Sequence, residues 1–182
     1  MSDNIAEALA TPLSGLGLVV VDVTVKPAGS RRVLRVLVDR DVSGLAASDS
    51  SSRVPPLSLD EVAAATRVVG VALDSRDLMG EQAYTLEVSS PGVGRPLSGY
   101  AALRRNVGRL VALDLEGREL DGNESLTGRV LRVTPDEMEV EVPATRRSPT
   151  HVRTVALGKV RSGTVQVEFG RAAKAESETE EG

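Results

Sequence analysis

The sequence predicts two domains: an α+β N-terminal domain of order α-β-β-α-β, with two helices on a three-stranded sheet, and a small all-β barrel after it. Two observations favour this division. Apolar residues recur with helical or alternating spacing up to residue 90, and mainly short alternating runs follow residue 105. A corner rich in proline and glycine separates the halves. We therefore expect domains at residues 1–90 and 98–170, joined by a linker at 91–97.

The N-terminal domain begins with a predicted helix over residues 3–15, where apolar residues recur at helical spacing and Pro12 is expected to kink the last turn. Residues 18–26 and 31–40 alternate between apolar and polar side chains, which is typical of strands with one buried face. Residues 27–30, Pro-Ala-Gly-Ser, predict a hairpin turn between them. The domain therefore starts as helix, strand, strand.

A serine-rich loop over residues 41–57 follows the second predicted strand. It has little apolar content and no period, so we expect it to be disordered. A second helix begins at a capping box, in which Ser58 and Glu61 satisfy each other's backbone donors, and runs to about residue 78. Residues 84–88 then alternate and predict the third strand.

The C-terminal half predicts a helical turn at residues 100–104 and then only strands. Five short strands favour a closed barrel, SH3-like or Sm-like, because closure removes exposed strand edges. Residues 171–182 form an acidic tail without large apolar side chains, which we expect to be disordered. The five predicted strands cover residues 106–115, 125–134, 138–142, 152–157 and 164–169.

Composition and charge limit the classes of function. The chain has no cysteine, no run of membrane-spanning length and no N-terminal secretory signal, so we expect a cytoplasmic protein without disulfides. Net charge is −4 over residues 1–90, +2 over 91–170 and −2 over 171–182. Because the excess over 91–170 is small, any contact with RNA must come from a local patch.

The sequence contains little that predicts catalysis. His151 is the only histidine and lies in a polar loop, and the acidic residues within 137–141 alternate with apolar ones, as on the solvent face of a strand. Ser89 and Ser90 lack the Gly-x-Ser-x-Gly elbow, and nucleotide-binding glycine loops are absent. We expect no enzyme, cofactor or metal; a hydrolase using Ser89 or Ser90 is the remote alternative.

Basic side chains of the second half are the candidate binding residues. Arginine presents a planar fork of donors that matches phosphate, although interspersed surface charge explains such residues equally well. Aromatic residues are 2% of the chain, so base stacking is not the expected mode of contact. The candidates are Arg104, Arg105, Arg109, Arg129, Arg132, Arg146, Arg147, Arg153, Lys159 and Arg161.

The corner carries a family resemblance. Residues 86–92, Leu-Glu-Val-Ser-Ser-Pro-Gly, followed by Arg-Pro-Leu at 95–97, resemble the signature of the bacterial ribosome maturation factor family RimP, with a departure at Gly94, where such proteins usually carry a polar residue. Residues 155–161 resemble the last barrel turn of that family. The resemblance covers about residues 16–170 and implies the two-domain architecture described above.

The same resemblance implies a function. It implies a non-enzymatic factor, expected here as a monomer, that binds the immature or free small ribosomal subunit, including its decoding-centre ribosomal protein and ribosomal RNA, and promotes its assembly. We expect Gly92 and Gly94 to act as a hinge. The alternative is an Sm-like RNA-binding regulator. A KH-type module is excluded because no two glycines are three residues apart, so its Gly-x-x-Gly loop is missing.

Overall fold

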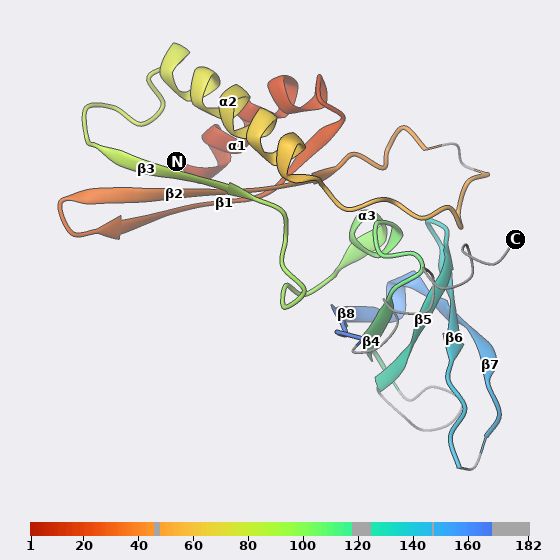
Figure 1. Cartoon of the computed structure of the whole chain (residues 1–182). Coiled ribbons are helices and arrows are strands. Elements are labelled where there is room, and N and C mark those ends of the chain that lie inside the picture. Colours follow the sequence, from red (N-terminus) through yellow and green to blue (C-terminus); the bar gives the residue numbers. More distant parts are fainter. Residues whose placement is uncertain (46–47, 118–124, 147, 169–182) are drawn as a thin grey trace, which may run out of the picture. The chain divides into compact units, whose positions relative to one another are not determined.

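The protein forms two compact units in the computed structural model, which describes residues 1–45, 48–117, 125–146 and 148–168 (Figure 1). The first unit comprises Met1–Leu45 and Val54–Gly92, and the second comprises Ala46–Arg53 and Val93–Gly182. A segment from the first half of the sequence therefore belongs to the second unit. As a result, the chain passes between the units three times, rather than once at the corner.

A three-stranded sheet forms the base of the first unit. Its strands are β1 (Leu18–Ala28), β2 (Arg31–Arg40) and β3 (Tyr84–Ser89), in the order β1-β2-β3. The first pair is antiparallel and closes through Gly29, whose φ of +63° suits a tight hairpin turn. The second pair is parallel, because α2 intervenes between its strands along the chain. The predicted strand pattern of this domain is confirmed.

Two helices, α1 (Ser2–Ser14) and α2 (Leu59–Ser75), lie on the same face of this sheet (Figure 1). The predicted capping box starts α2, with the Glu61 amide donating to Ser58 Oγ at 3.2 Å and the Ser58 amide donating to Glu61 Oε2 at 2.8 Å. The helices bury their apolar stripes against alternate residues of the strands. Fully buried side chains of this core include Leu9, Leu13, Leu34, Val36, Val38, Val69 and Leu73.

A five-stranded antiparallel sheet forms the second unit, in the order β7-β6-β5-β4-β8. A short helix, α3 (Gly99–Arg104), precedes it, and a 3-10 turn over Leu157–Lys159 leads into its last strand. Within the described residues, no ladder joins β7 to β8, so closure into a barrel stays a prediction. The strands are β4 (Leu110–Leu115), β5 (Ser125–Val133), β6 (Glu137–Val142), β7 (His151–Ala156) and β8 (Val160–Val165).

Two strands of this sheet begin elsewhere than predicted. Residues 105–109 form turns and bends rather than the start of β4, because Gly108 has a φ of +85°, which a strand does not allow. The last strand runs over Val160–Val165 instead of 164–169, since it pairs with β4 directly after the 3-10 turn. Phe169 and the acidic tail lie outside the described residues.

Close packing brings β5 against β6 at a glycine. A Cβ atom on Gly128 would lie 2.4 Å from Cγ1 of Val140 and 2.6 Å from the carbonyl oxygen of Glu141. A side chain at this position would therefore collide with backbone, which cannot move aside cheaply. The core around it is aliphatic and includes Leu103, Val111, Leu113, Leu115, Val130, Val133 and Met138.

Candidate nucleic-acid interface

Arg104, the first candidate binding residue, is 0% exposed and lies inside the second unit. Its guanidinium donates to the carbonyl oxygens of Ser52 at 2.6 Å and Asp49 at 3.0 Å, and to Ser52 Oγ at 2.8 Å. It also forms an ion pair with Asp49 Oδ1 at 3.2 Å. A buried guanidinium needs such partners, and here they come from a segment more than 50 residues earlier. Arg104 therefore holds the fold together instead of facing solvent.

Residues 48–53, here called the strap, are the described part of this segment. The Val133 amide on β5 donates to the Ser50 carbonyl oxygen at 2.8 Å. Within the strap, the hydroxyl and amide of Ser52 donate to the Asp49 carboxylate and, with the charge of Arg104, hold the pKa of Asp49 below its ordinary value. The strap is thus packed and hydrogen-bonded, whereas the sequence predicts disorder for residues 41–57.

Two candidate arginines on β5 form ion pairs with nearby carboxylates. Arg129 binds both carboxylate oxygens of Glu168, and its Nη1 also donates to the Gly108 carbonyl oxygen at 2.7 Å. Arg132 contacts Glu139 at 2.8 Å and Glu137 at 3.2 Å. The hydrogen bond to Glu139, together with the charge of Glu137, raises the pKa of Arg132. Arg132 therefore fits the interpretation as interspersed surface charge.

The remaining candidates differ in exposure. Arg105 and Arg153 are half-buried, at the end of α3 and on β7. Arg147 lies outside the described residues. Because these residues are spread over several turns and strands, the structure does not gather all ten candidates into one patch. The exposed candidates are Arg109, Arg146, Lys159 and Arg161.

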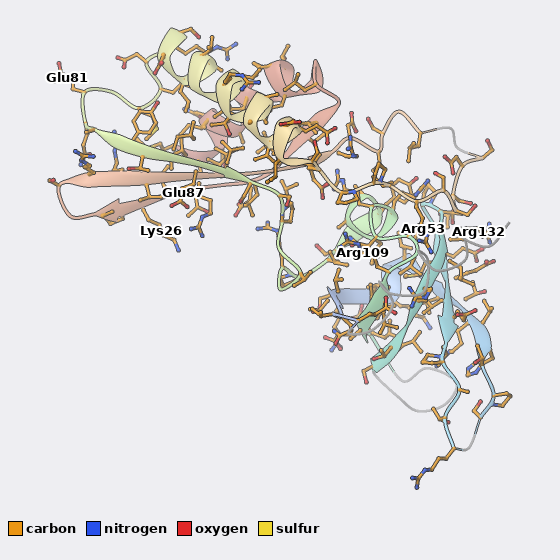
Figure 2. All side chains as sticks on the ribbon, viewed as in Figure 1. Lys26, Arg53, Glu81, Glu87, Arg109 and Arg132 are labelled. Carbon is orange, nitrogen blue, oxygen red and sulfur yellow. The ribbon has the colours of Figure 1, made fainter. Side chains whose placement is uncertain are left out.

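Arg53 is a basic residue of the second unit that was not among the sequence candidates. Arg53, at the end of the strap, is exposed and lies directly over Gly108, where a Cβ atom would be 2.6 Å from its Nε and 3.1 Å from its Cζ. Figure 2 labels Arg53 together with Arg109, which follows Gly108 in the chain. No sequence signal assigned Arg53 to this surface, since it lies in the N-terminal half. The structure thus places the guanidinium groups of Arg53 and Arg129 at Gly108, and Arg109 is the next residue in the chain.

The single histidine has no carboxylate partner in the described part of the chain. His151 Nδ1 lies 3.0 Å from the Pro149 carbonyl oxygen and 3.5 Å from Ser148 Oγ, in an exposed loop. Neither Ser89 nor Ser90 has a hydrogen bond to an acidic or basic side chain among these residues. The described residues contain no group of three or more possible ligands that could hold a metal ion. None of the helices in the described ranges has the length and the apolar character that spanning a membrane requires.

A small apolar hollow lies between α1 and α2 in the first unit. It has a volume of about 350 Å³ and its walls are mainly aliphatic side chains, without a carboxylate or histidine among them. Such a lining offers no acid or base for chemistry. The lining residues are Pro12, Arg67, Val68, Val71, Ala72, Ser75 and Arg76.

Comparison with known proteins places this architecture in a family. The family model for the RimP N-terminal domain matches residues 8–94. A ribosome maturation factor RimP of Acidothermus cellulolyticus is 33% identical over 174 residues, which cover 92% of this chain and 94% of the relative.

Two longer relatives carry the same printed name, ribosome maturation factor RimP. The protein of Frankia casuarinae is 38% identical over 171 residues, and that of a Parafrankia species is 35% identical over 196 residues. These alignments cover 88% and 93% of this chain but only 57% and 58% of the relatives, so the chain spans little more than half of their length. The Acidothermus relative, in contrast, is matched over nearly its whole length. The chain therefore belongs to the RimP family of ribosome maturation factors.

Proposed function

We propose that this protein binds the immature or free small ribosomal subunit and promotes its assembly, without catalysing a reaction. The observation that carries this proposal is the match to a ribosome maturation factor over 94% of that relative's length. Membership of the RimP family, whose relatives are named ribosome maturation factors, supports a factor that acts by binding. The site of action would be the cytoplasm, with the protein acting as a monomer.

The two units would bind different parts of the subunit. Residues 1–90 carry a net charge of −4 and would offer carboxylates to basic ribosomal proteins. The second unit would dock on the decoding-centre ribosomal protein, and its exposed arginines would bind phosphates of ribosomal RNA. Gly92 and Gly94, near the point where the chain enters the second unit, would serve as the hinge that lets both units engage. The mechanism would be transient scaffolding of an unfinished particle.

Co-sedimentation tests the proposal directly. Purified protein is centrifuged with free small subunits, large subunits and whole ribosomes, at low and high salt. We expect selective binding to free small subunits, weakened by salt because phosphate contacts release counterions. Deletion of the gene should in addition leave immature small subunits and unprocessed precursor RNA, and a normal subunit profile in the deletion strain would contradict the proposal.

The same assays separate the alternatives. An Sm-like regulator would bind free RNA tightly and ignore the small subunit. A hydrolase would show turnover that is lost when Ser89 or Ser90 is replaced with alanine. The match to a ribosome maturation factor over 94% of its length favours the assembly factor over both. In the described part of the chain, the two serines also have no hydrogen bond to an acidic or basic side chain.

A further inference from the structure

We propose that Arg53, Arg109 and Arg129 form a phosphate-binding site around Gly108, and that its ligand is a phosphodiester group of RNA. This inference rests on the proposed function and names the chemistry of one contact within it. The site belongs entirely to the second unit, although Arg53 reaches it from the first half of the sequence. No single stretch of sequence contains it.

Gly108 makes the site possible because it leaves room for the guanidinium of Arg53. A Cβ atom here would lie 2.6 Å from Arg53 Nε, closer than side chains tolerate, and the φ of +85° also favours glycine. On the same residue, the carbonyl oxygen accepts from Arg129 Nη1 at 2.7 Å. Two guanidinium groups from distant parts of the chain therefore contact one glycine.

The strap fixes where Arg53 lies. Ser52, its neighbour, is held by the buried guanidinium of Arg104 through both its carbonyl oxygen and its hydroxyl. The Ser50 carbonyl oxygen is bound by the Val133 amide at 2.8 Å. Arg104 is thus a positioning residue: it has no exposed surface of its own, but it anchors the segment that presents Arg53.

The charges of the site indicate an anion as the ligand. The guanidinium groups of Arg53 and Arg109 have no carboxylate partner among the described residues, and both side chains are exposed. The third, Arg129, already binds an anion, since both oxygens of the Glu168 carboxylate engage its fork. A phosphodiester group offers a comparable pair of anionic oxygens with the same single negative charge, so it would compete with Glu168 for this fork. Tyr84 and Tyr100, the aromatic residues that the structure describes, are half-buried, so we expect RNA contact here to be to the backbone rather than to bases.

Two opposite charge changes test the site. Arg53→Ala removes one phosphate contact, whereas Glu168→Gln removes the competing carboxylate. The probes are free small subunits and a short single-stranded RNA labelled for fluorescence anisotropy, each titrated between about 50 and 200 mM salt. We expect Arg53→Ala to weaken binding roughly three- to tenfold at low salt and to reduce the salt slope by about 1. Glu168→Gln should strengthen binding.

Matched controls lie in the first unit. Arg67→Ala and Glu81→Gln alter the net charge by the same amounts at exposed positions outside the site, and should leave both affinities nearly unchanged. Circular dichroism confirms that each variant is folded. The site would be overturned if Arg53→Ala bound both probes as tightly as Arg67→Ala does. It would also be overturned if Arg53→Ala bound small subunits more weakly with an unchanged salt slope, because that result would indicate a contact with a ribosomal protein instead.

The two probes distinguish failure of the site from failure of the proposed function. If the wild-type protein ignores small subunits but binds the RNA in an Arg53-dependent manner, the proposed function fails and the phosphate site stands. If it binds small subunits with no dependence on Arg53 or Glu168, only the site fails. Binding to neither probe would overturn both.

Discussion

The guanidinium group of Arg104 donates a hydrogen bond of 2.6 Å to the carbonyl oxygen of Ser52, 52 residues earlier in the chain. This bond joins a helix of the second unit to a loop that follows a strand of the first. The second unit is consequently not a continuous stretch of sequence, and its buried charge is satisfied only when the strap is in place.

Replacing Arg104 with methionine should destabilise the second unit. The change keeps an unbranched side chain but leaves the carbonyl oxygens of Asp49 and Ser52 without their donor. We expect the free energy of unfolding to fall by about 2–4 kcal/mol, because a buried polar group left unpaired costs about 1–3 kcal/mol. Urea unfolding, monitored through the NMR signals of the second unit, measures this decrease in the free energy of unfolding. The exposed Arg109→Met control should change stability by less than about 0.5 kcal/mol.

The strap should become less stabilising in acid. The pKa of Asp49 is lowered in the folded protein, chiefly by its hydrogen bonds from Ser52. A group with a depressed folded pKa stabilises the protein above its unfolded pKa, and this contribution disappears as the pH falls through the folded value. The stability difference between wild type and Asp49→Asn, measured by urea unfolding at several pH values, should therefore shrink below the ordinary pKa of aspartate. A constant difference across that range would contradict this assignment.

Gly128 should not tolerate a side chain. Its replacement with alanine would place a methyl group 2.4 Å from Val140 Cγ1 and 2.6 Å from the Glu141 carbonyl oxygen. We expect a loss of roughly 1–3 kcal/mol in the free energy of unfolding, as for other overpacked sites. Gly158→Ala is the matched control, since open space surrounds that position. Equal unfolding midpoints for the two variants would show that β5 and β6 adjust without cost.

The capping box of α2 should contribute to stability separately from the packing of this helix in the core. Ser58→Ala removes the acceptor for the Glu61 amide and should lower the stability of the first unit by about 1 kcal/mol. Because the hydrogen bonds from Ser58 are the main reason for the lowered pKa of Glu61, that pKa should also rise, although the bond from the Ser58 amide survives. Thermal unfolding and an NMR titration measure the two effects, and Ser58→Asp should restore most of the stability.

The hinge proposal predicts a functional effect without a stability effect. Space is open where Cβ atoms would lie at Gly92 and Gly94, and neither has a left-handed φ, so alanine fits both positions. Alanine reduces the conformational freedom of the chain there. The double variant should unfold like the wild type while its affinity for the small subunit changes. Unaltered binding, or identical NMR relaxation of both units in the wild-type protein, would argue against a hinge.

Local sequence pattern was sufficient to predict the helices and strands and their order along the chain. Side-chain alternation and helical spacing are properties of neighbouring residues, so they predicted both helices, the three strands of the first unit and the number of strands in the second, although the bounds of β4 and β8 differ. The capping box was readable for the same reason, as its two partners are three residues apart. The corner motif at residues 86–97 also carried the family resemblance.

The roles of the strap and of the arginines depend on contacts between residues that lie far apart in the sequence. The sequence of the strap resembles a disordered linker, and its partners on α3 and β5 lie more than 50 residues away. Equally, nothing near Arg104 in the chain distinguishes it from the exposed Arg109, and nothing near Arg53 connects it to Gly108. Burial and pairing of charge depend on contacts that close long loops, and local pattern does not record them.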